Sequence, residues 1–335
     1  MIRHASLHEK ELLISTLNTA FSDVRSSDFS IRQQQPRAYG EGINRAAEHL
    51  LEERDGKIVS ILGNLQETLQ VGNESYRFAT IGSVATLPSY RHRGIMRSLM
   101  EEAHQENKKN GEIFAILTGN PAVYHSLGFV PGPVNLLFTF PASTKKYPEY
   151  SARPMGEEDI GFAYALYRSS VPYRIRRPET FLAALGSHGS KAVVFYQGSK
   201  RIGYAAFNER YGNELCLNDP SHREAALSLL PSSLEWVFTP DDIASLRYAY
   251  EKGLTPRIWQ REMLHIYQPE AFLKLLHQKN GANLERDEMA LQVATQSGHF
   301  DSNAFVTSLF PPLGEEGITL SSHAYTFEIP WCDLF

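Results

Sequence analysis

Basic residues and a glycine lie where a predicted strand ends and a predicted helix begins, between Val84 and Arg97. Arg91, Arg93 and Arg97 bring fixed positive charge to this turn, and charge-assisted contacts to phosphate are stronger than neutral hydrogen bonds. The first N–H groups of a helix have no partner within it, and the helix dipole is positive at that end. The segment therefore predicts a pyrophosphate site, which Gly94 allows to approach the backbone closely. An exposed basic helix start is the alternative interpretation.

The elements around this segment follow the order of an α/β unit. Ser6 and Glu9 have the spacing of a capping box, which predicts a helix over about residues 7–21. The apolar runs KIVSILGNL, ETLQV and YRFATIGSVATL predict three strands of an antiparallel meander before Pro88. Apolar residues at helical spacing predict a helix that begins after Gly94. A strand, a second helix and a further strand complete the unit.

The length of 335 residues suits two or three domains. A polar stretch rich in proline, serine and lysine predicts the first boundary after residue 141. We expect one α/β unit over residues 1–141 and a second, with a similar order of elements, over residues 142–265. The pattern of residues 266–335 is mostly helical and predicts a small third region.

The composition excludes several classes of function. A formal net charge of -5 argues against a large phosphate-binding surface, so we expect no nucleic-acid partner. Cys216 and Cys332 are too few for a disulfide framework or a four-ligand zinc site, which indicates a cytoplasmic location. We also predict no metal and no membrane contact, because no metal-binding histidine spacing and no long apolar run is present. The glycine motifs of esterases, nucleoside triphosphatases and dehydrogenases are absent from the sequence.

Two motifs carry a resemblance to a known family. Arg91-His92-Arg93-Gly94-Ile95-Met96 resembles the acetyl-CoA motif of GNAT acetyltransferases: Arg or Gln, two residues, Gly, one residue, then Gly or Ala. Met96 departs from the small last residue. With the Tyr-x-x-x-Gly-Phe pattern of residues 124–129, the chain resembles the enhanced intracellular survival (Eis) family of tandem-GNAT acetyltransferases. Weaker similarity continues through ELCLNDPSHREAALSLL, the TPDD helix and RIWQREMLHIYQPEAFLKLL.

The resemblance implies an α/β (α+β) GNAT fold with a mixed central sheet and tandem GNAT-like domains. Residues 1–141 would form the domain that binds acetyl-CoA, and residues 142–265 a second, noncatalytic GNAT-like domain. This second domain lacks an Arg-x-x-Gly-x-Gly-like turn, so we expect it to bind no second acetyl-CoA. Residues 266–335 would form a truncated sterol-carrier-like domain whose tail reaches the active site.

The resemblance also implies the site and the reaction. An amine would attack the thioester of acetyl-CoA directly, with the pantetheine lying along the strand that ends at Thr86 and its N–H groups polarising the carbonyl. The expected cofactor-binding residues are Val84, Ala85, Thr86, Arg91, His92, Arg93, Gly94, Ile95, Met96, Arg97 and Asn120.

Tyr124 would be the general acid that protonates the leaving thiolate. Its alternative is a buried tyrosine with a locally satisfied hydroxyl. Asn120 would bond the pantetheine arm or simply form a turn. The terminal carboxylate of Phe335 would accept the proton of the amine, although water or Asp333 could replace it.

The sequence leaves the acceptor open. A small-molecule or peptide amine, such as a polyamine, an aminoglycoside-like antibiotic or a lysine side chain, would bind in a pocket between the domains lined by acids. The competing hypothesis is a noncatalytic sensor or scaffold that binds acetyl-CoA or CoA. A homo-oligomer is possible.

Overall fold

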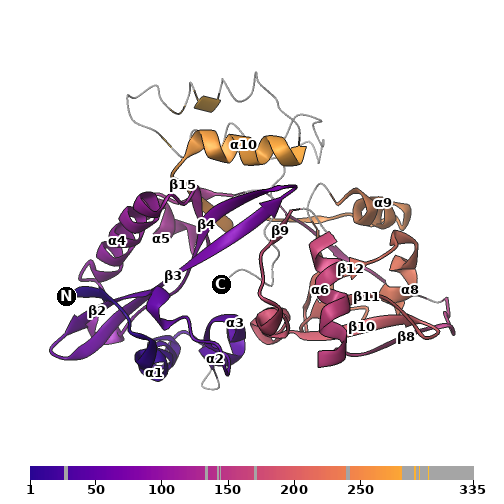
Figure 1. The fold of residues 1–335 in the computed structure, drawn as a ribbon, viewed down its shortest axis with the longest axis horizontal. Helices are drawn as coiled ribbons and strands as arrows, with labels where there is room; N and C mark the ends of the chain where they lie inside the picture. Colours follow the sequence, from indigo (N-terminus) through magenta and orange to yellow (C-terminus); the bar gives the residue numbers. More distant parts are fainter. Residues whose placement is uncertain are drawn as a thin grey trace.

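Two mixed β-sheets lie side by side in the computed structural model (Figure 1). The structure describes residues 1–25, 29–132, 135–141, 143, 145–169, 172–238, 242–280, 290, 291, 294 and 301. We call the first sheet with its helices the first half, and the second sheet with its helices the second half. No helix among the described residues has the length and apolar character needed to cross a membrane.

The first sheet is apolar on both faces because neighbouring side chains of a strand point in opposite directions. Leu51 packs with helices α1 (Lys10–Phe21), α2 (Ile31–Gln34) and α3 (Pro36–Tyr39) on one face, whereas Leu50 packs with helix α4 (Ile95–Asn110) on the other. In the described part of the chain this sheet has the order β1 (Ile2–His4), β2 (His49–Arg54), β3 (Lys57–Val71), β4 (Glu74–Thr86), β5 (Phe114–Thr118), β15 (Glu262–Ile266) and β6 (Val130–Pro131), with β9 (Tyr173–Arg174) paired to β3.

Helices of both halves form where the sequence supplies apolar stripes and caps. The described helices are α1 (Lys10–Phe21), α2 (Ile31–Gln34), α3 (Pro36–Tyr39), α4 (Ile95–Asn110), α5 (Pro121–Tyr124), α6 (Ile160–Ser169), α7 (Phe181–Leu185), α8 (Arg223–Ser228), α9 (Ile243–Glu251) and α10 (Pro269–Asn280). Helix α10 packs Phe272, Leu275 and Leu276 against the last residues of β3, the first residues of β4, and β5.

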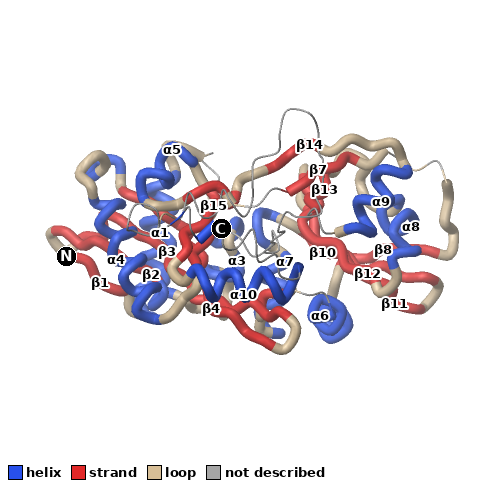
Figure 2. The backbone as a smooth tube through the Cα atoms, turned by 90° about the horizontal axis from the view of Figure 1, so that it is seen from above, coloured by secondary structure: helices blue, strands red, loops and turns tan. Residues whose placement is uncertain are grey.

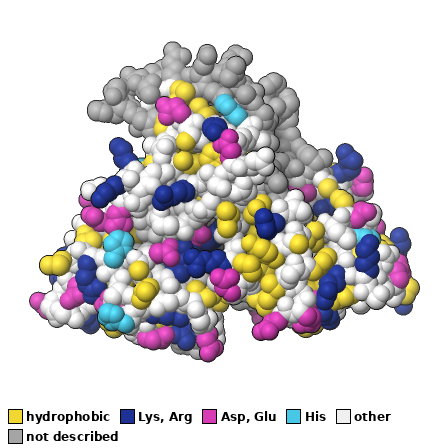
Figure 3. Space-filling model, viewed as in Figure 1, with side chains coloured by type: hydrophobic (Ala, Val, Ile, Leu, Met, Phe, Trp, Pro, Cys, Tyr) yellow, Lys and Arg dark blue, Asp and Glu magenta, His cyan; other side chains and the backbone are white. Residues whose placement is uncertain are grey.

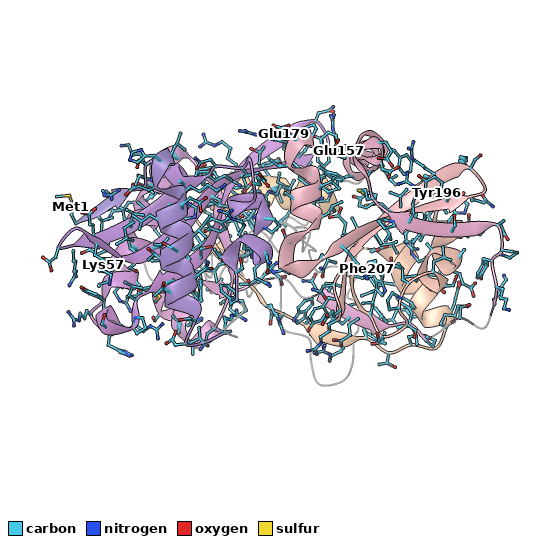
Figure 4. All side chains as sticks on the ribbon, turned by 90° about the horizontal axis from the view of Figure 1, so that it is seen from below. Met1, Lys57, Glu157, Glu179, Tyr196 and Phe207 are labelled. Atoms are coloured by element: carbon cyan, nitrogen blue, oxygen red, sulfur yellow. The ribbon has the colours of Figure 1, made fainter. Side chains whose placement is uncertain are left out.

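The second sheet has the same two-sided construction. Helices α8 and α9 cover one face, and α6 and α7 cover the other. Figure 4 shows Tyr196 and Phe207 on its strands, in the half of the molecule opposite to Met1 and Lys57. Among the described residues its strand order is β14 (Arg257–Trp259), β7 (Asn135–Thr139), β13 (Glu235–Phe238), β12 (Tyr211–Leu217), β11 (Lys200–Phe207), β10 (Lys191–Gln197) and β8 (Tyr150–Pro154).

The two sheets exchange one strand each. β7 follows β6 in the chain but pairs with β13 and β14 of the second sheet. β15 follows β14 but pairs with β5 and β6 of the first sheet. Figure 2 shows β15 among the strands of the first half and β7 among those of the second. Each half therefore depends on a strand from the other part of the chain.

The mixed α/β fold class predicted from the sequence is confirmed. The Ser6–Glu9 capping box is present, and α1 continues the short 3-10 helix Leu7–Glu9. The predicted break between KIVSILGNL and ETLQV is wrong, because β3 runs uninterrupted from residue 57 to 71 and pairs with β4 along this length. The domain limits at residues 141 and 265 stay predictions, and both exchanged strands lie beside them.

A buried charge cluster joins the halves at β3 and β9. Glu67 accepts hydrogen bonds from Arg45 at 2.7 Å and from Arg174 Nε at 2.7 Å, and Arg37 lies 3.3 Å away. Burial alone would raise the pKa of Glu67, but the charges of Arg174, Arg45 and Arg37 outweigh it and lower the pKa to about 2.

The cluster borders a groove of about 710 Å³ that also touches Glu179. Figure 3 shows basic and acidic side chains gathered in the middle of this face, and Figure 4 shows Glu179 near the boundary between the halves.

Glu262 lies at the point where the second exchanged strand enters the first sheet. Its backbone oxygen accepts the Gly132 N–H at 2.8 Å, and its carboxylate accepts from Asn135 Nδ2 at 3.1 Å. Asn135 is the first residue of the other exchanged strand. Burial raises the pKa of the Glu262 carboxyl from its usual 4.5 to about 7. The protonated form of Glu262 is therefore the one that the fold favours.

We expect Glu67→Gln to lower the free energy of unfolding by about 3–5 kcal/mol, because it leaves buried arginines without their shared carboxylate. Urea denaturation measures this change. The matched control is Glu11→Gln, which removes the exposed ion pair of Glu11 with Arg32 and should cost less than about 1 kcal/mol. Equal small losses in both variants would show that the cluster does not hold the halves together.

We expect the stability of the wild type to fall, relative to Glu262→Gln, as the pH rises from about 4.5 to about 7. The raised pKa means that the contribution of protonated Glu262 is fully present below the unfolded pKa and is lost as the pH rises through the folded one. A shift from 4.5 to about 7 corresponds to at most about 3 kcal/mol. Paired urea titrations at several pH values measure the difference. A pH-independent difference would contradict this prediction.

Candidate functional site

A cavity of about 740 Å³ lies between the diverging ends of β4 and β5. The two strands pair in parallel only at Ala79 with Ala115 and Thr80 with Ile116. Beyond these pairs, residues 81–84 of β4 and residues 118–120 after β5 form opposite walls of the cavity. In the described part of the chain, this edge of β4 has no strand partner, so its backbone N–H and C=O groups are available to a ligand.

A bulge in β4 shapes the cavity wall. Ser83 has a φ of 50°, which is uncommon for a residue other than glycine, and the β3–β4 register shifts beside it. The Tyr39 hydroxyl lies 2.6 Å from Ser83 Oγ and 2.7 Å from His49 Nε2. Burial lowers the pKa of His49 to about 4, so its ring is neutral at pH 7. This hydrogen-bonded chain holds the bulge that turns β4 away from β5.

The turn before α4 presents a run of backbone donors. His92 and Gly94 have φ values of 61° and 76°. Among the described residues, the N–H groups from His92 to Arg97 have no acceptor, and the first bond toward the helix runs from the Ser98 N–H to Gly94 O at 3.1 Å. Successive N–H groups in such a turn, next to a helix start, form an anion-binding concavity. Met96 packs its side chain against the core on the α4 face, which leaves its N–H accessible.

The three arginines of this turn differ in their roles. The Arg91 guanidinium donates to Asp23 at 2.5 Å, to Thr86 O at 3.1 Å and to Ala20 O at 2.9 Å. This corrects the expectation that the Arg91 charge faces a phosphate, because its side chain ties the end of β4 to the end of α1. Arg93 and Arg97 are exposed and contact only Ser89 and Tyr90, and Ser126, respectively, within the described residues.

Tyr124 lines the cavity from the end of α5. Gly119 makes room for its ring, since a Cβ on Gly119 would lie 2.3 Å from Tyr124 Cε2. Within the described residues the Tyr124 hydroxyl makes no hydrogen bond, so the predicted alternative of a locally satisfied hydroxyl has no support there. Burial raises the pKa of the phenol, which keeps it protonated at neutral pH.

The other residues predicted for the site differ in whether they line the cavity. The Asn120 side chain accepts the Ala122 N–H at 3.1 Å and caps α5, as the turn interpretation predicts, while Asn120 also lines the cavity. Val84 lines the cavity, and Ala85 and Thr86 continue β4 beyond it. Phe335 and Asp333 lie outside the described residues.

The charge of the cavity differs from the expectation. An acid-lined pocket was predicted, but no aspartate or glutamate is among the described lining residues. Arg25 and Arg261 line it instead, together with His188 of the second half. Sequence reasoning missed Arg25, His188 and Arg261 because they lie far apart in the chain and belong to no motif. Among the described residues, no cluster of three potential metal ligands occurs.

Among its described residues, the second half shows no turn like the one that residues 91–97 form before α4. Its β12 and β13 form the parallel pair that corresponds to β4 and β5. Helix α8 follows the short helix Pro220–His222 directly, with no intervening turn. The Asp219 carboxylate accepts the Ser221 N–H at 2.8 Å, so a side-chain carboxylate already caps the start of this short helix. That residues 142–265 bind no second acetyl-CoA stays a prediction.

Comparison with known proteins points to one family. Residues 1–132 match the model of the acetyltransferase (GNAT) domain. An uncharacterized N-acetyltransferase of Streptomyces coelicolor is 25% identical over 249 residues, which are 64% of this chain and 58% of that protein. The match thus spans less than two thirds of the relative's length.

Solved structures share the fold at low sequence identity. A GCN5-related N-acetyltransferase from Anabaena variabilis has a TM-score of 0.60 and 17% identity, covering 80% of this chain and 73% of its own. Eis1 from Mycobacterium abscessus has a TM-score of 0.56 and 16% identity, covering 82% and 76%. Residues 1–132 are therefore similar to the GNAT acetyltransferase domain, and most of the chain has a fold similar to that of Eis1.

Proposed function

We propose that this protein is an N-acetyltransferase that transfers an acetyl group from acetyl-CoA to an amine. The observation that carries the proposal is the cavity beside the open edge of β4, which Tyr124 enters from one wall. GNAT proteins generally use acyl-CoA, and the chain offers a place for each part of such a donor. Acetyl-CoA, when bound, supplies an activated acetyl thioester.

The fit of the donor rests on backbone groups. The N–H groups from His92 to Arg97 suit a pyrophosphate, because they are consecutive and free among the described residues. The unpaired edge of β4 from Ile81 to Thr86 suits the amide groups of the pantetheine arm, which resemble peptide groups. Asn120 has its amide nitrogen left over after capping α5. Arg93 and Arg97 add charge around the phosphates.

Tyr124 suits the role of general acid in this arrangement. Its protonated phenol borders the same cavity as the edge of β4, where a thioester would lie. Because a thiolate leaves when the amine attacks the acetyl carbon, a proton must reach the sulfur, and the phenol can donate it. Backbone N–H groups of β4 would stabilise the carbonyl oxygen as it gains negative charge.

We expect Tyr124→Phe to lower kcat by about 100-fold or more, in line with the usual contribution of a general acid, while the Kd of acetyl-CoA changes by less than about twofold. CoA release with an amine panel measures kcat, and calorimetry measures Kd. Tyr250→Phe, at an exposed tyrosine of α9, is the control. Unchanged turnover in Tyr124→Phe would remove the acid role, and tight acetyl-CoA binding without turnover on any amine would favour the noncatalytic sensor.

We expect Gly94→Ala to weaken acetyl-CoA binding by about 10-fold, because a side chain at positive φ costs about 1–2 kcal/mol and distorts the donor turn. Gly198→Ala is the matched control: Gly198 also has positive φ and open space around a Cβ, but it lies in the β10–β11 turn. Both variants should lose similar stability in thermal melts. Equal acetyl-CoA affinity in the two would place the phosphates elsewhere.

A further inference from the structure

We propose that the acceptor is an amine that also carries a carboxylate, such as an amino acid with an apolar side chain, held by Arg25 and Arg261. This inference rests on the proposed acetyl transfer and names the substrate class of the same site. It replaces the cationic acceptors that the net charge of the chain suggested. The cavity, and not the whole molecule, sets the local preference for charge.

The described walls of the cavity carry positive charge without a matching negative one. Arg25 follows the end of α1, and Arg261 lies in the connection that leads from β14 of the second sheet to β15 of the first. Within the described residues neither guanidinium lies in an ion pair or donates a hydrogen bond. By contrast, Arg45 and Arg176, which border the groove beside β9, each have a carboxylate partner. Two unpaired arginines on one cavity are suited to an anionic group of a ligand.

Arg261 is exposed and borders the cavity, and its guanidinium contacts an aromatic ring. Its guanidinium lies over the Trp259 ring, 4.8 Å from the ring centroid, a contact that orients a cation without neutralising it. The neighbouring carboxyl, Glu262, is turned to Asn135. Burial raises its pKa to about 7, so near neutral pH it offsets only part of the arginine charge.

These arginines are separate from the phosphate-binding turn. None of the residues from Arg91 to Arg97 lines the cavity, whereas Arg25 and Arg261 share it with Tyr124. A ligand group that reaches Arg25 or Arg261 therefore lies in the cavity that Tyr124 also lines. The charge belongs to the acceptor side of the proposed reaction.

The rest of the wall indicates the body of the acceptor. Phe21, Phe29, Ile31 and Val123 line the same cavity and offer apolar surface. A polyamine or an aminoglycoside would place further cations among these groups and beside two arginines, which is unfavourable. An amine with one carboxylate and an apolar side chain satisfies both the charge and the surface.

The test uses the full-length protein and matched acceptors: L-phenylalanine, L-phenylalaninamide and phenethylamine, with spermidine and an aminoglycoside for comparison. We expect kcat/KM for L-phenylalanine to exceed that for each carboxylate-free partner by about 10- to 100-fold, the range expected of hydrogen bonds to a charged group. The amide is the sharper comparison, because its amine is less basic than that of the amino acid and is more often neutral. Calorimetry in the presence of CoA measures acceptor binding without turnover.

Arg25→Gln and Arg261→Gln should each remove most of this preference and leave phenethylamine within about twofold of the wild type. Arg247→Gln, at an exposed arginine of α9 that lines no described cavity, should keep the preference. Equal or better turnover of phenethylamine or spermidine would overturn the inference while acetyl transfer stands. If no amine is acetylated, the proposed function fails and the acceptor assignment fails with it. Calorimetry then decides only whether the two arginines bind a carboxylate: tighter, Arg261-dependent binding of L-phenylalanine than of its amide supports this role, and equal binding overturns it.

Discussion

The exchange of β7 and β15 between the two sheets is the constraint on which the rest of the structure depends. β15 pairs with β5 on the side opposite to β4, so a strand from the second part of the chain completes the sheet whose other strands open into the cavity. Thr118 on the cavity wall is the direct partner of Glu262. The same connection carries Arg261 into the cavity. The site therefore belongs to both halves, although the GNAT family model covers only residues 1–132.

In the proposed function, backbone groups more than side chains would hold acetyl-CoA. Arg91 is used to hold the end of β4 against Asp23 and α1, and this contact fixes the edge along which a pantetheine arm could lie. The turn before α4 depends on positive φ at His92 and Gly94, which aligns its successive backbone N–H groups. Side-chain charge then distinguishes the two ends of the site: Arg93 and Arg97 beside the turn, Arg25 and Arg261 inside the cavity.

Local patterns predicted local structure well. The Ser6–Glu9 capping box predicted α1, and the helical spacing of apolar residues after Gly94 predicted α4. Both signals are local, because caps and apolar stripes act within a few residues. The strand exchange could not be predicted, since no local pattern states which strand a run of apolar residues will pair with. The role of Arg91 depends on Asp23, which lies 68 positions away. The charge of the cavity likewise depends on Arg25 and Arg261, which only the folded chain brings together.

The position of β15 also has a consequence for synthesis of the chain on the ribosome. The first sheet lacks the strand between β5 and β6 until residues 262–266 have been synthesised, so one edge of β5 stays exposed until then. β7 likewise has no partner strand until β13 has been synthesised. Neither half can finish folding by itself, and a nascent chain halted between them would offer two unpaired edges to chaperones or to other chains.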